Sequence, residues 1–245
     1  MTIKKVLNEI KKGDYEYVDM RFTDPRGKLQ HVTVMASEVD EGFLKSGWMF
    51  DGSSIAGWKS INESDMKLMP DLDSGYLDPF YSEKTYCLHC NVVEPETGKL
   101  YGRDPRSTAV KAEEYLKKTK IGTKAYFGPE AEFFLFDDVK FSNSMNKVSF
   151  EVDAMDASWN TDTSYEMGNM GHRPGVKGGY FPVNPTDAGQ DIRSEMLSTM
   201  KRMGMKVDKH HHEVASCQHE LGLVFDALKT QGDNLQKYKY VIQNV

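Results

Sequence analysis

The stretch Tyr126-Phe-Gly-Pro-Glu-Ala-Glu-Phe-Phe-Leu-Phe136 places two acids inside a dense run of aromatic and apolar residues. Such a composition predicts a buried β-strand. Residues two apart in a strand point to the same face, so Glu130 and Glu132 are expected to project side by side. Burying two like charges is costly unless a cation lies between them, and a divalent metal ion meets that need. The alternative is an exposed strand start after Gly128-Pro129.

A second acidic stretch, Lys206-Val-Asp-Lys-His-His-His-Glu-Val-Ala215, also has the pattern of an extended segment. Alternation predicts one face with Lys209, His211 and Glu213, and an opposite face with Asp208, His210 and His212. Glu220 follows Glu213 by seven residues. The candidate metal ligands are therefore Glu130, Glu132, Glu213 and Glu220. Carboxylate oxygens suit Mg²⁺ or Mn²⁺ better than Zn²⁺.

Two other groups of potential ligands are interpreted as structural. The histidine run 210–212 could be a surface run or a copy of a purification tag, but its position within the chain argues against a tag. Cys87-Leu-His-Cys90 looks like half a zinc site. However, no second Cys-x-x-Cys is present, and cysteines three apart on a strand face opposite sides. We therefore expect both cysteines to be small buried side chains.

Length, charge and composition narrow the class of protein. A chain of 245 residues with 39% hydrophobic residues is expected to form one or two globular domains. A net charge of −6 without a basic stripe argues against nucleic-acid binding. No apolar run reaches membrane-spanning length, and the N-terminus lacks a signal-peptide core, which predicts a cytoplasmic protein with no membrane partner. Three cysteines fit a reducing compartment.

Hydrophobic periodicity predicts an α+β protein. The expected helices are 2–12, one starting at Asp104-Pro105, 191–204 and 232–245, and the expected strands are 15–23, 29–35, 86–93, 126–136 and a strand or hairpin over 138–150. Residues 101–107 mark a domain boundary, and 159–189 is expected to be a long functional loop. The stretch 47–58 is predicted to be a loop around Asp51. Its apolar residues need a surface to bury against, either another subunit or its own packing.

Four segments resemble signatures of bacterial type I glutamine synthetases. They are Phe50-Asp-Gly-Ser-Ser54, Phe127-Gly-Pro-Glu-Ala-Glu-Phe-Phe133, Gly175-Val-Lys-Gly-Gly-Tyr-Phe-Pro182 and His210-His-His-Glu-Val-Ala215. The resemblance covers the whole chain, although members of that family are about twice as long, so it matches their N-terminal half. It implies a β-grasp-like N-terminal domain over residues 1–103 and the first part of the catalytic α+β domain over residues 104–245.

The implied activity is ATP-dependent ligation of ammonia to L-glutamate, giving L-glutamine through γ-glutamyl phosphate, in nitrogen assimilation. By this resemblance two Mg²⁺ or Mn²⁺ ions per site neutralise the anionic reactants. Glu132, Glu213 and Glu220 would hold one ion near glutamate, with Glu132 also contacting the substrate. Glu130 would help to hold the second ion near ATP, and Asp208 would contact the nucleotide.

The resemblance also implies an assembly. Family members form dodecamers of two stacked hexameric rings with active sites between neighbouring subunits. Asp51 would reach into the neighbour's site, bind ammonium and help to remove its proton. A carboxylate suits that role because it attracts the cation before accepting the proton.

Two departures from the family pattern matter. Some relatives have one more residue between the acids matched by Glu213 and Glu220, which we interpret as a loop variant. The family's later arginines, its remaining ligands of the second metal and its adenylylation tyrosine have no match up to Val245. Residues 1–245 alone are therefore expected to be inactive and aggregation-prone. The alternatives are a glutamate ligase for another amine, which Asp51 in its Gly-Ser-Ser context disfavours, and a noncatalytic half-length interaction protein, which the intact acids disfavour.

Overall fold

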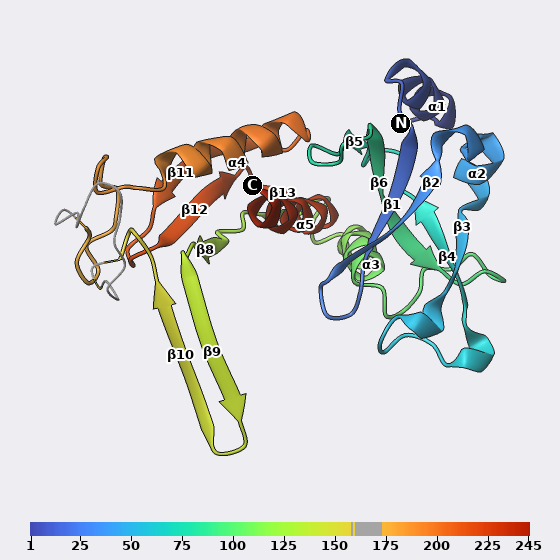
Figure 1. Ribbon diagram of the computed structural model, residues 1–245. Coiled ribbons are helices and arrows are strands. Elements are labelled where there is room, and N and C mark those ends of the chain that lie inside the picture. The colour runs from blue at the N-terminus through green and yellow to red at the C-terminus, as the bar shows by residue number, and fades with distance from the viewer. Residues whose placement is uncertain (158, 160–172) are drawn as a thin grey trace.

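The computed structural model describes residues 1–157, 159 and 173–245. Figure 1 shows an N-terminal group of strands, a second group of strands and helices, and two helices between them, α3 and α5. The arrangement confirms the expected α+β class. Within the predicted loop 159–189, residues 160–172 lie outside the described part of the chain. No helix within the described part of the chain is long and apolar enough to cross a membrane.

The N-terminal group contains a six-stranded sheet and two α-helices. The main path of the sheet runs β2-β1-β6-β4-β3, with β5 paired to β6. Its elements are α1 (Ile3–Lys12), β1 (Tyr17–Thr23), β2 (Leu29–Met35), α2 (Glu41–Ser46), β3 (Trp48–Asp51), β4 (Asp65–Pro70), β5 (Tyr76–Leu77) and β6 (Thr85–Val93). The central strands β1 and β6 are parallel, and the other pairs are antiparallel. Thr2 caps α1 by accepting a hydrogen bond from the backbone N–H of Lys5, as predicted.

The two faces of β6 lead to different surroundings. Tyr86, Leu88 and Cys90 point into the core under α1, α2 and the Trp58 loop. Cys87 belongs to the core that the sheet shares with the second half of the chain. Both cysteines are free and buried, and they lie in different clusters, which confirms the structural interpretation of this pair.

The stretch predicted as the loop 47–58 contains a strand. Gly47 has φ of 74°, a left-handed conformation that ends α2 and lets β3 start at the next residue. β3 then pairs with β4 along its whole length, from Trp48 to Asp51. The prediction of a loop was wrong here, because the pairing partner is β4, which begins at Asp65 beyond the stretch. Of the apolar residues expected to be buried, Trp58 is 4% exposed, whereas Trp48 and Met49 are 38% and 46% exposed.

The second half of the chain begins with α3, capped by Asp104 through the backbone N–H groups of Arg106 and Ser107, as the Asp-Pro signal predicted. Its elements are α3 (Pro105–Thr119), β7 (Tyr126–Phe127), β8 (Glu132–Phe134), β9 (Asp138–Ser144), β10 (Lys147–Asp153), α4 (Gln190–Arg202), β11 (Val207–His212), β12 (Gln218–Leu223), β13 (Asp226–Ala227) and α5 (Leu228–Asn244).

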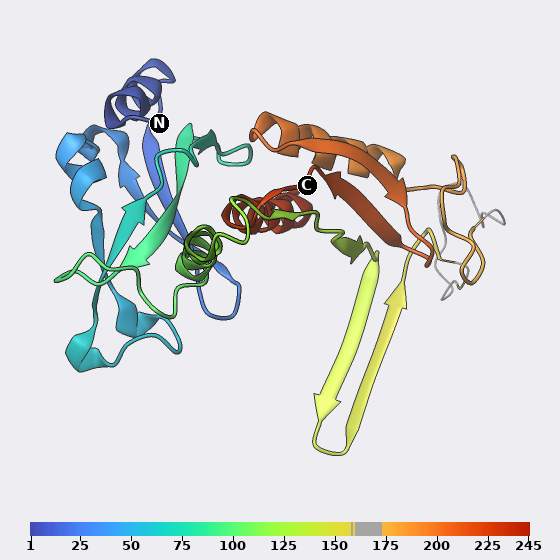
Figure 2. The ribbon, with the colours of Figure 1, turned by 180° about the vertical axis from the view of Figure 1, so that it is seen from behind.

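Strands β11, β12 and β8 form an antiparallel three-stranded sheet, called the outer sheet below. One of its faces packs on α4 and α5 through a core that includes Met196, Met200, Leu221 and Tyr238. The β9–β10 hairpin extends away from this body (Figures 1 and 2), with Phe141 81% exposed. The hairpin predicted for residues 138–150 is confirmed.

The stretch 126–136 does not form the single buried strand predicted from its composition. It divides at Gly128-Pro129 into β7, which pairs with β13, and β8, which pairs with β12. Proline lacks the N–H that a continuous ladder needs, so the pairing stops there. Glu130 lies between the two strands, and Glu130 and Glu132 are both exposed. The expected side-by-side placement of these acids on one strand was therefore wrong.

Candidate functional site

Pairing in the outer sheet aligns three polar residues in one row. His211 on β11 is opposite Glu220 on β12, and Glu220 is opposite Glu132 on β8. Residues directly opposite one another in a sheet project from the same face. Glu213 follows His211 by two residues and continues that face beyond the end of β11. The outer sheet thus gathers three acids and one imidazole on the face away from α4.

The centre of this group is compact. One ligand atom from each of His211, Glu213 and Glu220 lies within 4.8 Å of the other two, and we call these three residues the carboxylate–histidine group. The imidazole stands between the acids, with Nδ1 3.4 Å from Glu213 Oε1 and Nε2 3.6 Å from Glu220 Oε2. Both acids are less than one-tenth exposed. Burial, together with the neighbouring Glu213 carboxylate, raises the pKa of Glu220.

The carboxylate–histidine group fits a divalent cation in both chemistry and spacing. Ligands of one Mg²⁺- or Ca²⁺-like ion lie at roughly 2.0–2.6 Å from it and hence within about 5 Å of each other. Carboxylates are the ligands that Mg²⁺ and Mn²⁺ prefer, and imidazole suits the transition metals. Two buried acids so close together repel each other, and a cation between them removes that cost.

The other two predicted ligands lie outside this group, although both belong to the described chain. Glu132 accepts a hydrogen bond from the side-chain amide of Gln218, whose own oxygen accepts from the backbone N–H of Ala215 at 2.9 Å. Gln218 therefore anchors the Glu132 carboxylate on the same sheet face, beside Glu220. Glu130 sits on the link between β7 and β8.

The placement of Asp208 differs from simple alternation. The β11–β12 register shifts between Val207 and His210, as in a β-bulge, where two residues oppose one. A Cβ added to Gly222 on β12 would overlap the Asp208 carboxylate and lie 2.7 Å from Cγ of Lys209. Gly222 follows Glu220 by two residues, so Asp208 lies over the face of the carboxylate–histidine group. The prediction that Asp208 faces away from it was wrong, because the bulge inverts the alternation.

Behind the outer sheet, Arg193 on α4 holds the two strands that carry the group. Its side chain is fully buried and donates to both carboxylate oxygens of Asp187. It also lies 2.9 Å from Nδ1 of His219 on β12 and donates to Nδ1 of His210 on β11 at 3.3 Å. Burial, with Arg193 adjacent, lowers the pKa of His219 to about 4. One guanidinium therefore fixes residues that alternate with His211 and Glu220.

Asp51, the predicted catalytic acid, lies on the other sheet. It ends β3, is exposed, and accepts hydrogen bonds from the backbone N–H of Ser53 at 2.8 Å and from its hydroxyl at 2.6 Å. These hydrogen bonds lower the pKa of Asp51, so the carboxylate is ionised at neutral pH. Figures 1 and 2 show β3, which Asp51 ends, in the N-terminal group of strands, whereas β8, which Glu132 begins, belongs to the outer sheet of the second group.

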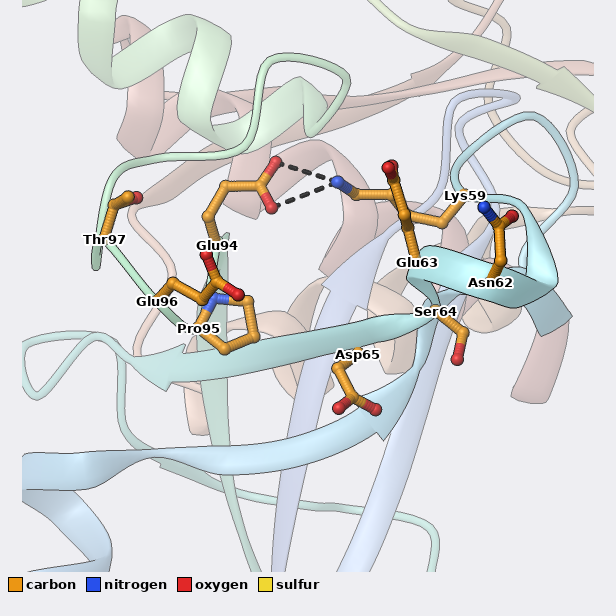
Figure 3. A pocket seen from close by; sticks show the side chains of 9 residues that line it. All are labelled: Lys59, Asn62, Glu63, Ser64, Asp65, Glu94, Pro95, Glu96 and Thr97. Carbon is orange, nitrogen blue, oxygen red and sulfur yellow. Dashed lines mark hydrogen bonds and ion pairs between the residues drawn. The ribbon is translucent and has the colours of Figure 1, made fainter.

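A pocket of about 540 Å³ adjoins the Asp51 loop and is shown in Figure 3. Its lining includes Asp65, the pairing partner of Asp51, and the ion pair between Lys59 and Glu94. The pocket shares no residue with the carboxylate–histidine group.

His211 is the member of the group that sequence reasoning did not assign as a ligand. Alternation had placed it on the face of Glu213, and that signal was sufficient to include it. Gln218, the anchor of Glu132, carried no comparable signal, because its role depends on the pairing of β12 with β8.

The fold and the site define an α+β protein in which an N-terminal mixed sheet is joined to a second sheet with a candidate divalent-metal site. Residues 14–95 match the family model for the β-grasp domain of glutamine synthetase, and residues 102–245 match the model for its catalytic domain. The chain belongs to the glutamine synthetase family, and its N-terminal part is the β-grasp domain that was expected.

Similar proteins agree with this assignment. The chain is 68% identical to a glutamine synthetase of Cereibacter sphaeroides and 67% identical to one of Rhodobacter capsulatus, and each alignment covers 99% of this chain. The structure resembles a Plasmodium falciparum glutamine synthetase with a TM-score of 0.87 and 27% identity, over 99% of this chain and 48% of that chain. The chain spans about half the length of the two bacterial relatives, 52% and 55%.

Proposed function

We propose that the protein ligates ammonia to L-glutamate with ATP, forming L-glutamine through γ-glutamyl phosphate and so assimilating nitrogen. Family membership supports the reaction, and the carboxylate–histidine group is the observation that carries the proposal. The reaction brings the anionic γ-carboxylate of glutamate against the anionic γ-phosphoryl group of ATP. A site that gathers acids around a cation position is suited to that problem.

In this proposal Glu213, Glu220 and Glu132 hold one Mg²⁺ or Mn²⁺, and Glu130 helps to hold a second. The bound cations supply positive charge that offsets the repulsion between the two anionic reactants. Within the chain, Gln218 orients Glu132 toward substrate, and the bulge presents Asp208 to the nucleotide on the same face. His211 contacts both acids and so aligns them before the cation binds.

The ammonia step is assigned to Asp51 of a neighbouring subunit. Its exposed and ionised carboxylate attracts ammonium and then accepts a proton, which leaves ammonia to attack the acyl carbon as phosphate departs. This requires a homo-oligomer, proposed to be a dodecamer with active sites between subunits. The exposed aromatic residues of the β9–β10 hairpin, Phe141 and Phe150, support a subunit contact there. We also propose the division into domains 1–103 and 104–245 and a cytoplasmic location.

Asp51→Asn in the assembled enzyme tests the assignment of the ammonia step. The amide cannot accept the proton, so ammonia-dependent turnover should fall far more than ATP-dependent formation of acyl phosphate, measured as phosphate release or hydroxylamine trapping. Asp51→Glu is the matched variant, and it should retain part of the ammonia step. Equal loss of both steps in Asp51→Asn would contradict the role.

We further propose that residues 1–245 by themselves do not catalyse the reaction. The carboxylate–histidine group occupies one face of the outer sheet, and phosphoryl transfer also needs cationic groups on the transferred phosphoryl. Purified residues 1–245, expressed in a host that lacks glutamine synthetase, should show no γ-glutamyl transfer. Robust turnover by this chain would overturn the proposal.

A further inference from the structure

A pocket of about 340 Å³ lies where the N-terminal sheet meets α5, and we call it the junction pocket. Segments more than 200 residues apart contribute to it, namely the end of β1 with the following turn and β2, and the second half of α5. A volume of this size is in the range of small-molecule sites. The lining is separate from the carboxylate–histidine group and from the Asp51 loop.

The ionisable side chains that line the junction pocket are mainly basic. The lining includes four basic residues, Arg21, Lys28, His31 and Lys239. Carboxamides and phenols supply most of the remaining polar groups, and none of the described residues that line the pocket is Asp or Glu. The chain as a whole carries a net charge of −6, so this concentration of basic groups runs against its composition.

The base of the pocket is rigid. Arg21 is only 2% exposed, and it donates through Nε to Asp19 at 2.7 Å and through Nη1 to Tyr76 at 2.9 Å. Asp19 also forms a hydrogen bond with Nδ1 of His31 at 2.7 Å. This bond raises the pKa of the His31 imidazole, and the other ring nitrogen, Nε2, takes no part in it. Two buried acids lie behind the pocket, Asp19 and Asp78, and both are already paired, Asp19 with Arg21 and His31 and Asp78 with Arg21. The two lysines remain at its rim.

The two sides of the pocket are tied together by α5. Gln236 donates to the hydroxyl of Thr23 at 3.1 Å and to the carbonyl of Gly27 at 3.0 Å. Lys239 donates to the same carbonyl at 3.0 Å, which uses one of its three N–H donors. The helix therefore holds the β1–β2 turn in place and keeps Lys239 and Lys28 close to the same opening.

We propose that the junction pocket binds a small dianion, either a dicarboxylate or a phosphate monoester. Basic groups from two separate segments favour a ligand with two negative charges over one with a single charge. The side-chain amide of Gln243, which lines the same pocket, suits carboxylate or phosphate oxygens. A ligand held in this way contacts the N-terminal sheet and α5 together, so it stabilises the junction between the two halves of the chain.

The test uses residues 1–245, purified as a soluble monodisperse species, with EDTA present. The protein is titrated by calorimetry with inorganic phosphate and, separately, with succinate. At least one of these ions should bind saturably and raise the unfolding temperature, whereas potassium chloride at matched ionic strength should not. Binding of phosphate alone would assign a phosphate ligand, and binding of succinate alone a dicarboxylate. Saturable binding of neither ion would overturn the proposal.

Variants locate the binding. The double variant Lys28→Gln/Lys239→Gln should weaken binding roughly tenfold or more, because both lysines are exposed at the rim and can lose their charge without unfolding the chain. Lys118→Gln, on the exposed face of α3, is the matched control and should bind like the original chain. Unchanged affinity in the double variant would also overturn the proposal. No metal or turnover is needed, so failure here leaves the proposed ligase activity untouched.

Discussion

The two sheets of this protein arrange their charged residues in opposite ways. At the junction, buried charges of opposite sign are paired, as Arg106 is with Asp71 at 2.6 Å and with Asp233 at 2.8 Å. On the outer sheet, Glu213 and Glu220 carry the same sign and face each other across His211. Paired charges at the junction fix a structure, whereas the surplus of negative charge on the outer sheet creates a place for a cation. The contrast separates acids that are paired with cationic side chains from the acids that we propose as metal ligands.

Removing the positive charge of Arg106 from the junction should have the largest effect on stability. Arg106→Leu would leave the partly buried carboxylates of Asp71 and Asp233 without their shared partner, although Lys229 still pairs with Asp71, so the free energy of unfolding should fall by about 3 kcal/mol. Urea unfolding followed by tryptophan fluorescence measures it. Lys45→Met, which breaks an exposed pair with Glu41, is the control and should change stability by less than about 0.5 kcal/mol. An equally small loss in Arg106→Leu would break the contrast.

The junction should also give the fold a pH dependence through His89. Burial lowers its pKa from the ordinary 6.5 to about 4, so the unfolded chain binds this proton more readily than the folded chain between these values. Stability should therefore rise with pH across that window and be lost as pH falls from 6.5 to 4, by about 3 kcal/mol in total. Carboxylates whose pKa is lowered by folding, such as that of Asp71, change the stability only at pH values below this window.

His89→Gln removes this titration, and the slope of unfolding free energy against pH between 6.5 and 4 should become smaller. It should not vanish, because the pKa of His219 is lowered to about 4 as well. The slope, rather than the absolute stability, is the quantity to compare. A slope identical to that of the original chain would show that His89 is not held neutral by burial.

Crowding on the outer sheet is tested at Gly222. A methyl group there would overlap the Asp208 carboxylate and press on Lys209, so Gly222→Ala should lower stability by about 1–2 kcal/mol and displace Asp208. Gly232→Ala in α5 is the matched control, since nothing lies within 4 Å of its added Cβ, and it should be neutral or slightly stabilising. Equal behaviour of both variants would mean that Asp208 does not lie over β12.

The smallest expected effect is a gain of stability rather than a loss. Glu220→Gln removes one of two neighbouring carboxylates, so the metal-free chain should gain about 0.5–1 kcal/mol of stability in EDTA at pH 8. Glu195→Gln, on the exposed side of α4, should change stability by less than about 0.5 kcal/mol. A clear loss of stability in Glu220→Gln would show that this acid is paired like those of the junction.

Features with local causes could be predicted from the sequence. Thr2 and Asp104 cap their helices as expected, because a cap needs only the next few residues. The strand Leu29–Met35 has the predicted bounds, since a Pro- and Gly-containing turn precedes it and alternation continues through it. Glu213 and Glu220 were predicted as ligands of one cation, and the structure brings their carboxylates within 4.8 Å of each other.

Features that depend on distant partners could not be predicted in the same way. The division of 126–136 follows from two different pairing partners, β13 and β12, which lie about 100 residues further along the chain. The bulge at Asp208 depends on Gly222. The strand 15–23 was predicted from alternation, but that pattern does not show that Arg21 is buried against α5 and Asp78. Each case needs the tertiary structure, which no local pattern contains.

Binding of Mn²⁺ to residues 1–245 tests the central claim most directly, because free Mn²⁺ gives an electron paramagnetic resonance signal that is lost when the ion binds. The original chain and Glu195→Gln should remove this signal saturably, and Glu213→Gln and Glu220→Gln should each weaken binding roughly tenfold or more. An undiminished signal with the original chain, or equal binding by Glu220→Gln, would contradict a cation site on the outer sheet.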